Sequence, residues 1–191
     1  MRDPLRLLLG LLLVSPGIFV HADVTRHPLP GGSTFPISQA VEISSGSLVY
    51  FSGTTPAPVD ATATRGTPAY YGDTETQTVS VFNRIQTNLE NLGLGLGDVV
   101  KMTVFLVGDP ALDNRMDFDG FMAGYTRFFG TEEQPALPSR SAVQVAGLVS
   151  PLMFVEVEVV AVRDTAAPGA RTPGDGSRLR DSDNLLDFLG F

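Results

Sequence analysis

Residues 97–107 read GDVVKMTVFLV, and after the opening Gly-Asp pair this stretch predicts a β-strand. Its apolar side chains recur at every second position, as they do when one face of a strand is buried. These alternating positions are Val100, Met102, Val104 and Leu106. We therefore expect a strand with one face turned toward a core that the neighbouring segments complete.

Two helical segments flank this strand. Residues 74–92 carry apolar side chains at three- and four-residue spacing, which predicts a helix with one buried stripe. The stripe consists of Val79, Phe82, Ile85, Leu89 and Leu92. Thr74 and Gln77 have the spacing of a capping box at the first turn. We expect a second helix over residues 117–129, and we assign its aromatic face to core packing rather than to cofactor binding.

Further strands are expected at residues 40–44, 48–51, 139–146 and 152–163. The order of elements is then strand, strand, helix, strand, helix, strand, strand, in which the helices cannot cover both faces of a sheet evenly. The sequence therefore predicts an α+β fold with two helices packed on one face of a mixed sheet. The opposite face also carries apolar side chains, so we expect oligomerisation sheet to sheet to cover it.

The N-terminal segments lie outside this pattern. Residues 1–22 have the features of a secretory signal: a basic start, a broken apolar run and a small-residue cleavage site ending at Ala22. The run is shorter than the roughly 20 apolar residues of a membrane span, although an uncleaved anchor is the alternative. We therefore expect a periplasmic or secreted protein without a stable membrane span after cleavage. Residues 23–34 are predicted to be a flexible leader and residues 35–163 the folded domain.

The C-terminal segment, residues 164–191, is rich in Pro, Gly, Asp and Arg, a composition typical of disorder. It nevertheless ends in apolar side chains, namely Leu185, Leu186, Phe188, Leu189 and Phe191. The alternatives are a frayed hydrophobic terminus and a docking peptide that folds on a protein partner. Asp183 and Asp187 argue against a membrane as the partner.

Composition excludes several kinds of chemistry. The chain has no cysteine, which excludes disulfides, thiolate catalysis and cysteine-bound zinc. Of its two histidines, His21 lies in the predicted signal and His27 in the predicted leader, so we expect neither a Ser-His-Asp triad nor a multi-histidine metal site. The net charge is −8 and Lys101 is the only lysine, a balance that repels nucleic acid and anionic membranes.

Arg140 is the first candidate for a functional side chain. It follows Pro138-Ser139 just inside a predicted strand, a position where a side chain is held rigidly. Its guanidinium offers a planar fork of donors that matches a carboxylate. The alternative is a surface arginine paired with a neighbouring acid.

Two glutamates and a Ser-Gly pair supply the remaining candidates. Glu156 interrupts an apolar strand, where a carboxylate is costly unless paired or hydrated, and where it can serve as a general acid or base. Glu158 shares its face, and spacing alone does not choose between them. Ser52 and Gly53 end a predicted strand, where glycine permits close approach by a ligand, although a simple turn is the alternative.

These candidates fall within sequence blocks that resemble those of the Rid family, the YjgF-type reactive intermediate deaminases. The blocks are Ser52-Gly53, residues 97–105, Pro138-Ser139-Arg140-Ser141-Ala142-Val143 and Val155-Glu156-Val157-Glu158. They occur in the family's order within residues 35–163. The resemblance implies a chorismate-mutase-like fold in a homotrimer, in which the sheets surround a central barrel and ligand clefts lie between neighbouring subunits.

The resemblance also implies a reaction, the hydrolysis of small enamines and imines such as 2-iminopropionate to 2-oxo acids and ammonia, without metal or cofactor. Arg140 would hold the carboxylate of this small ligand. Glu156 would position or activate the water, and the backbone carbonyl of Ala142 would help to hold the reacting nitrogen or water. Ser52 and Gly53 would contribute to the substrate site.

Three positions depart from the family's pattern. Ile37 stands where a tyrosine is frequent, Ala142 where a cysteine is common, and Met122 where some members have an asparagine. These changes predict an altered cleft and an altered substrate. The alternative functions are a non-catalytic trimeric protein that binds 2-oxo or amino acids, a ribonuclease, and an interaction protein that works through its tail. The acidic charge argues against the ribonuclease.

Overall fold

The computed structural model describes residues 19–20 and 22–166. Val20–Thr165 forms one compact unit, which carries the fold. The signal predicted for residues 1–22 lies mostly outside the described residues, and the predicted tail lies outside them beyond residue 166. Both assignments therefore stay predictions.

Within the described residues, seven strands form one mixed sheet in the order β2-β3-β7-β5-β8-β4, with β6 paired to the end of β5. Strand β7 runs parallel to β5 and to β3, and the other pairs are antiparallel. The strands of this sheet are β2 (Val24–Pro28), β3 (Ser38–Ile43), β4 (Ser47–Tyr50), β5 (Val99–Asp109), β6 (Arg115–Met116), β7 (Ser139–Val145) and β8 (Val155–Arg163). Short strands β1 (Phe19–Val20) and β9 (Thr165–Ala166) stand at the ends of the described chain.

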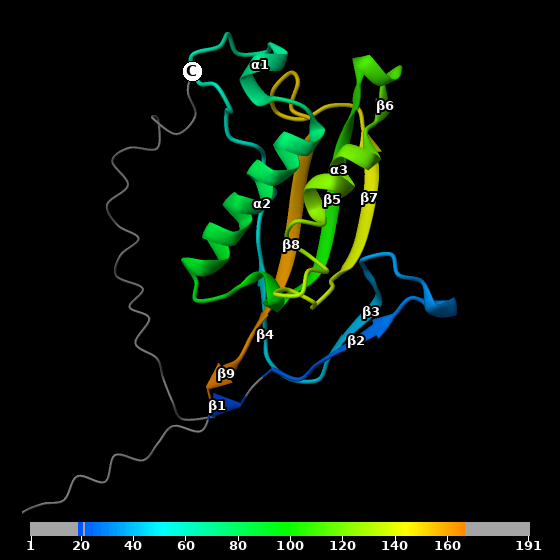
Figure 1. The fold of residues 1–191 in the computed structure, drawn as a ribbon. Helices are drawn as coiled ribbons and strands as arrows, with labels where there is room; N and C mark the ends of the chain where they lie inside the picture. Colours follow the sequence, from blue (N-terminus) through cyan, green and yellow to red (C-terminus); the bar gives the residue numbers. More distant parts are fainter. Residues whose placement is uncertain (1–18, 21, 167–191) are drawn as a thin grey trace, which may run out of the picture. The chain divides into compact units, whose positions relative to one another are not determined.

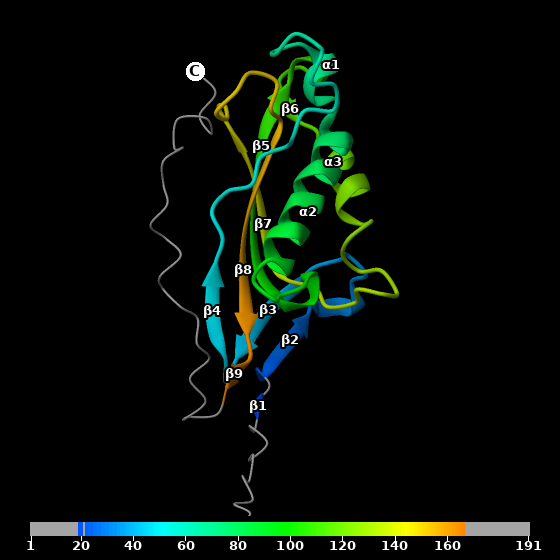
Figure 2. The same cartoon turned by 90° about the vertical axis from the view of Figure 1, so that its left-hand side faces the viewer.

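Both long helices cover the same face of the sheet (Figures 1 and 2). They are α2 (Thr74–Glu90) and α3 (Phe118–Tyr125), whereas the single turn α1 (Pro68–Tyr71) lies beside the start of α2. Three 3₁₀ turns, at Pro30–Gly32, Leu96–Asp98 and Pro110–Leu112, complete the elements of the described residues. The predicted mixed sheet with two helices on one face is thus confirmed. No helix among the described residues is long and apolar enough to cross a membrane.

The second helix is shorter than predicted. It ends at Tyr125 rather than at residue 129, and the chain continues as a turn. Phe129 is nevertheless fully buried in that turn, with its ring stacked at 5.1 Å from the ring of Tyr125. The aromatic pattern in the sequence therefore extends beyond the helix, because the turn that follows α3 also directs its aromatic side chain into the core.

The core lies between the helices and the sheet. Met102, Val104 and Leu106 of β5 are buried in this core as predicted, but Val99 joins them there in place of Val100, because the register shifts between Val99 and Lys101. On α2, Phe82, Ile85 and Leu89 are buried as predicted, but Leu92 is 48% exposed. Val81, which the spacing did not single out, is fully buried. Burial of such apolar area, at about 25 cal/mol per Å², is the main force that fixes the helices on the sheet.

The start of α2 differs from the predicted capping box. Asp73 caps the helix, because its carboxylate accepts a hydrogen bond from the backbone N–H of Thr76 at 2.8 Å. Gln77 is instead buried and joins the helix to the sheet. Its amide donates to the carbonyls of Gly72 and Leu152 and accepts from the backbone N–H of Phe154, at 3.0, 2.9 and 2.7 Å.

The leader also differs from the prediction. Residues 24–28, expected to be flexible, form strand β2 at the edge of the sheet and pair with β3. Pro28 lies where the register shifts, at the end of the strand. Proline is tolerated at such an edge because its missing N–H interrupts no internal ladder.

Candidate active site

Arg140 projects from β7 toward the face that the helices cover. It lies opposite Met102 of β5, whose side chain is fully buried in the core. Directly opposite residues of paired strands share a face, so Arg140 points to the same side. The guanidinium carbon lies 4.2 Å from the ring centre of Tyr125 and 5.1 Å from that of Phe121. It also lies 5.4 Å from the ring centre of Phe35 and 5.9 Å from that of Phe118.

This guanidinium has more donor capacity than the chain satisfies. Its Nη2 lies 3.2 Å from the sulfur of Met122, a weak acceptor, and its buried Nη1 has no hydrogen-bond partner among the described residues. None of the described carboxylates forms a salt bridge with it. Burial lowers the pKa of Arg140, and the nearby Tyr125 opposes this shift. Such a guanidinium has the chemistry to bind an anion, because cation–π contacts leave its in-plane donors open.

Glu156 lies on the opposite face of the sheet. It pairs with Phe105 of β5, which is three residues from the partner of Arg140 and therefore on the other side. Gly53 lies directly against it: a Cβ added to this glycine would come within 1.9 Å of Glu156 Oε1. The segment that carries Gly53 is held there by the pairing of Thr54 with Val157. The close approach predicted for this glycine is therefore an approach to a carboxylate of its own chain.

The contact with Gly53 distinguishes the two glutamates, between which the sequence spacing did not choose. Glu158 pairs with Thr103 and is exposed, whereas Glu156 is half-buried beside Gly53. Ser52 is exposed in the same segment. The structure thus brings Ser52, Gly53 and Glu156 together on one side of the sheet.

Ala142 belongs with the arginine. It lies two residues further along β7, opposite the buried Val104, so its side chain shares the face of Arg140. The candidate residues therefore form two groups on opposite faces of one sheet, Arg140 with Ala142 and Glu156 with Ser52 and Gly53. Within a single chain these groups do not meet.

The aromatic surroundings of the arginine were missed. The aromatic face of residues 117–129 was predicted to pack in the core alone, and Phe35 was not among the predicted site residues. The rings of Phe121 and Tyr125 are indeed fully buried, but they also pack against the guanidinium of Arg140. Met122 was the one hint of these surroundings in the sequence, because the family resemblance places it in the ligand cleft, and its sulfur contacts the guanidinium.

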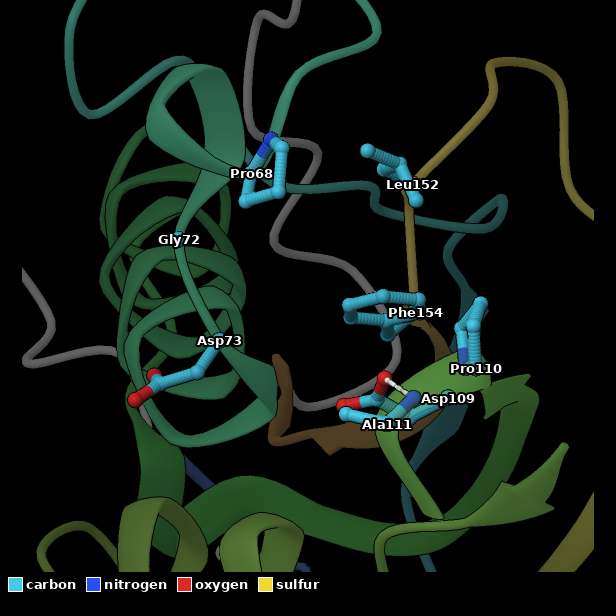
Figure 3. Close-up of a pocket in the computed structure, with 8 residues that line it drawn as sticks. All are labelled: Pro68, Gly72, Asp73, Asp109, Pro110, Ala111, Leu152 and Phe154. Carbon is cyan, nitrogen blue, oxygen red and sulfur yellow. Dashed lines mark hydrogen bonds between the residues drawn. The ribbon is translucent and has the colours of Figure 1, made fainter. Parts of the chain in front are cut away.

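A separate cavity of about 360 Å³ lies at the start of α2 and contains none of the predicted site residues (Figure 3). Pro68, Leu152 and Phe154 form apolar walls. Its two carboxylates, Asp73 and Asp109, each accept a backbone N–H at the start of a helical turn. A carboxylate ligand would meet like charges there and no cation, so this cavity is a poor match for an anion. Among the described residues no group of three or more His, Asp and Glu side chains could hold a metal ion.

Comparison with known proteins places this geometry in context. The family model described as Endoribonuclease L-PSP matches residues 32–163. A RutC family protein of Haemophilus influenzae is 35% identical over 128 residues, which cover 67% of this chain and 87% of that protein. A 2-iminobutanoate/2-iminopropanoate deaminase of Salmonella typhimurium is also 35% identical over 128 residues, covering 67% and 88%.

Solved structures are similar as well. A protein of unknown function of the conserved Rid family from Yersinia pestis has a TM-score of 0.54 at 22% identity, covering 72% of this chain and 97% of that one. A protein of unknown function from Pseudomonas aeruginosa has a TM-score of 0.51 at 26% identity, covering 76% and 96%. The likeness confirms the chorismate-mutase-like fold.

Proposed function

The chain belongs to the Rid (YjgF-type) family, and from that premise we propose that it hydrolyses small enamines and imines of 2-oxo acids, releasing ammonia. The family includes proteins named as deaminases of such imines. The observation that supports the reaction here is the half-buried guanidinium of Arg140, whose Nη1 lacks a partner among the described residues. A 2-imino acid carries a carboxylate that matches this fork of donors.

Hydrogen bonds from Arg140 to the substrate carboxylate would supply the binding energy. A charge-assisted hydrogen bond contributes about 1.5–3 kcal/mol, roughly twice a neutral one. The rings beneath Arg140 hold the guanidinium in place and exclude water from one side of it. The carboxylate therefore orients the C=N carbon of the substrate relative to β7, where the carbonyl of Ala142 is available to the reacting nitrogen or water.

A second subunit supplies the carboxylate base in this proposal. Arg140 and Glu156 lie on opposite faces of their own sheet, so one cleft that holds both must combine two chains. The face that carries Glu156 also exposes apolar side chains, since Tyr50 is 74% exposed and Leu48 and Val143 are each 45% exposed. Such a surface favours burial against further copies of the chain. A homotrimer closed around these faces would bring Glu156 of one subunit to Arg140 of the next.

The proposed hydrolysis has two stages and needs no cofactor. Glu156 accepts a proton from the water as the water oxygen bonds to the C=N carbon, and it passes that proton to the nitrogen to give a neutral tetrahedral carbinolamine. A proton returned to the nitrogen makes ammonia the leaving group, while the oxygen loses its proton and the C=O bond forms. One imine and one water give one 2-oxo acid and one ammonia. Positioned proton transfer of this kind contributes about 10²–10⁴-fold to the rate.

The ribonuclease activity in the name of the matching family model is not favoured for this chain. Phosphate contacts are normally made by clusters of lysine and arginine. This chain has a net charge of −8 and a single lysine, Lys101. We also propose that the protein is exported, on the signal-like residues 1–22, and that its apolar C-terminus binds a protein partner.

Ammonia release from imines generated freshly by an amino-acid oxidase tests the function. We expect release faster than in the absence of protein, and loss of this acceleration in Arg140→Ala. Saturable binding of a 2-oxo acid without any acceleration would instead support the alternative, a binding protein without turnover. Acceleration that survives Arg140→Ala would contradict the role of this arginine.

A further inference from the structure

The wall around the Arg140 guanidinium is apolar wherever the described residues form it. Phe35 and Phe118 present their rings to it, and Met122 presents its sulfur. All three side chains are partly accessible, with Phe35 39% exposed. The hydroxyl of Tyr125, whose ring lies against the guanidinium, donates to the carbonyl of Pro36 at 2.8 Å. A ligand whose carboxylate binds Arg140 therefore meets hydrocarbon and sulfur with its remaining atoms.

A cavity of about 260 Å³ shares one residue with this wall, because Phe35 both lines the cavity and lies 5.4 Å from the Arg140 guanidinium carbon. Its other apolar lining residues are Pro28, Leu29, Ile37, Pro135 and Leu137. This volume lies just below the roughly 300–1,000 Å³ of pockets that enclose whole drug-sized ligands. It suits a part of a ligand, such as a side chain, rather than a complete molecule.

Most polar groups of this cavity are already engaged with the backbone. Arg26 donates through Nη2 to the carbonyls of Gly97 and Val99, at 2.7 and 3.1 Å. The hydroxyl of Ser38 donates to the carbonyl of Leu137 at 2.7 Å. The cavity therefore offers a side chain mainly apolar contact, and among its described polar groups the buried Nε of Arg26 is a donor without a partner.

We propose that the site selects 2-imino acids with a large apolar side chain, an aryl side chain above all, over those that carry only a methyl group. The inference rests on the proposed function and names the substrate class of the same site. The carboxylate binds Arg140 while the side chain passes Phe35 into the cavity. A methyl group would leave that space unfilled, and a single methylene in an apolar pocket changes specificity by about 10–200-fold.

Imines generated in place from phenylalanine, leucine and alanine test the preference. We expect kcat/KM for the phenylalanine imine to exceed that for the alanine imine by at least about tenfold, with the leucine imine between them. An equal or higher value for the alanine imine would overturn the inference and leave the proposed function intact.

Binding of 2-oxo acids separates the two ideas if no imine is turned over. In that case the proposed function fails, but Kd values for phenylpyruvate and pyruvate, measured by calorimetry, still decide the preference. Phenylpyruvate bound at least about tenfold more tightly supports it, and equal affinities overturn it. Phe35→Ser should bring either ratio close to one, whereas Leu92→Ser, at an exposed apolar residue in the turn after α2, should leave it unchanged.

Discussion

Arg140 and Glu156 lie on opposite faces of the same sheet, each directly opposite a residue of β5. The arginine shares the face of the buried Met102, and the glutamate shares the face of Phe105, three residues away. No side-chain rotation can bring the two groups together through a sheet. If both act on one substrate, they do so from two chains, so the proposed reaction requires assembly.

The two glutamates of β8 form a matched pair for testing the base. Glu156→Gln should lower kcat by about 100- to 10,000-fold, because the amide cannot accept the proton of the attacking water. Binding of a 2-oxo acid should persist, since Arg140 is intact. Glu158→Gln, on the same face of the same strand but exposed and away from Gly53, is expected to keep activity within about twofold. Equal losses in both variants, measured as ammonia release, would argue against a specific role for Glu156.

Gly53 should be required for activity rather than for folding. A methyl group there would come within 1.9 Å of Glu156 Oε1, and the flexible carboxylate would have to move away. Gly53→Ala should therefore lower kcat/KM by at least about tenfold and change the free energy of unfolding by less than about 1 kcal/mol. Gly147→Ala is the control, because a Cβ at Gly147 meets nothing within 4 Å. Full activity of Gly53→Ala would show that the carboxylate does not need its present position.

Gln77 should be a determinant of stability. Its amide makes three buried or partly buried hydrogen bonds, and the two with Leu152 and Phe154 join α2 to the segment entering β8. Gln77→Leu would leave two carbonyls and one N–H without partners, at about 1–3 kcal/mol each. We expect urea denaturation to show a loss of about 3 kcal/mol or more, against less than about 0.5 kcal/mol for Gln86→Leu, because the half-buried Gln86 bonds to Glu90 at the surface. Similar values for the two variants would contradict this role.

Alkaline titration should reveal the burial of Tyr125. Burial raises the pKa of Tyr125 from 10.0 to about 12, with the charge of Arg140 opposing the shift. The folded state therefore keeps the phenol proton after the unfolded chain has begun to lose it. This contribution, about 2–3 kcal/mol, is complete below pH 10 and is lost as the pH rises to about 12.

Tyr125→Phe isolates that contribution. The variant removes the hydroxyl and its bond to the carbonyl of Pro36, so it should be less stable than the parent at neutral pH by about 1 kcal/mol. The difference in unfolding free energy between the two proteins should then shrink and change sign between pH 10 and 12, because the parent loses more stability than the hydroxyl contributes at neutral pH. A difference that stays constant over that range would mean that Tyr125 titrates alike in the folded and unfolded states.

Local patterns predicted the elements that depend on local order. The alternation in β5 and the spacing of Phe82, Ile85 and Leu89 in α2 are properties of short segments, and the structure buries them as expected. The strand in the leader was not predicted, because its pairing with β3 is a property of two segments together. Its own sequence, with Pro28 and His27, has no strong strand pattern.

The candidate site was predictable as a set of residues but not as a geometry. Arg140 and Glu156 were identified, yet the rings around the arginine come from segments far apart in the chain, such as Phe35 and Tyr125. The choice of Glu156 over Glu158 also required Gly53, about a hundred residues away, and its contact through the folded sheet. Contacts of this range arise only when the whole sheet is assembled.

Mixing two inactive variants tests the shared cleft most directly. Arg140→Ala and Glu156→Gln protomers, unfolded together, refolded in equal amounts and assayed for ammonia release, should regain about a quarter of the parent activity, because a quarter of randomly formed clefts combine an intact arginine with an intact glutamate of the neighbouring subunit. Each variant refolded alone should stay inactive. Activity that remains at the level of the separate variants, in assemblies shown to be mixed, would contradict a site built from two chains.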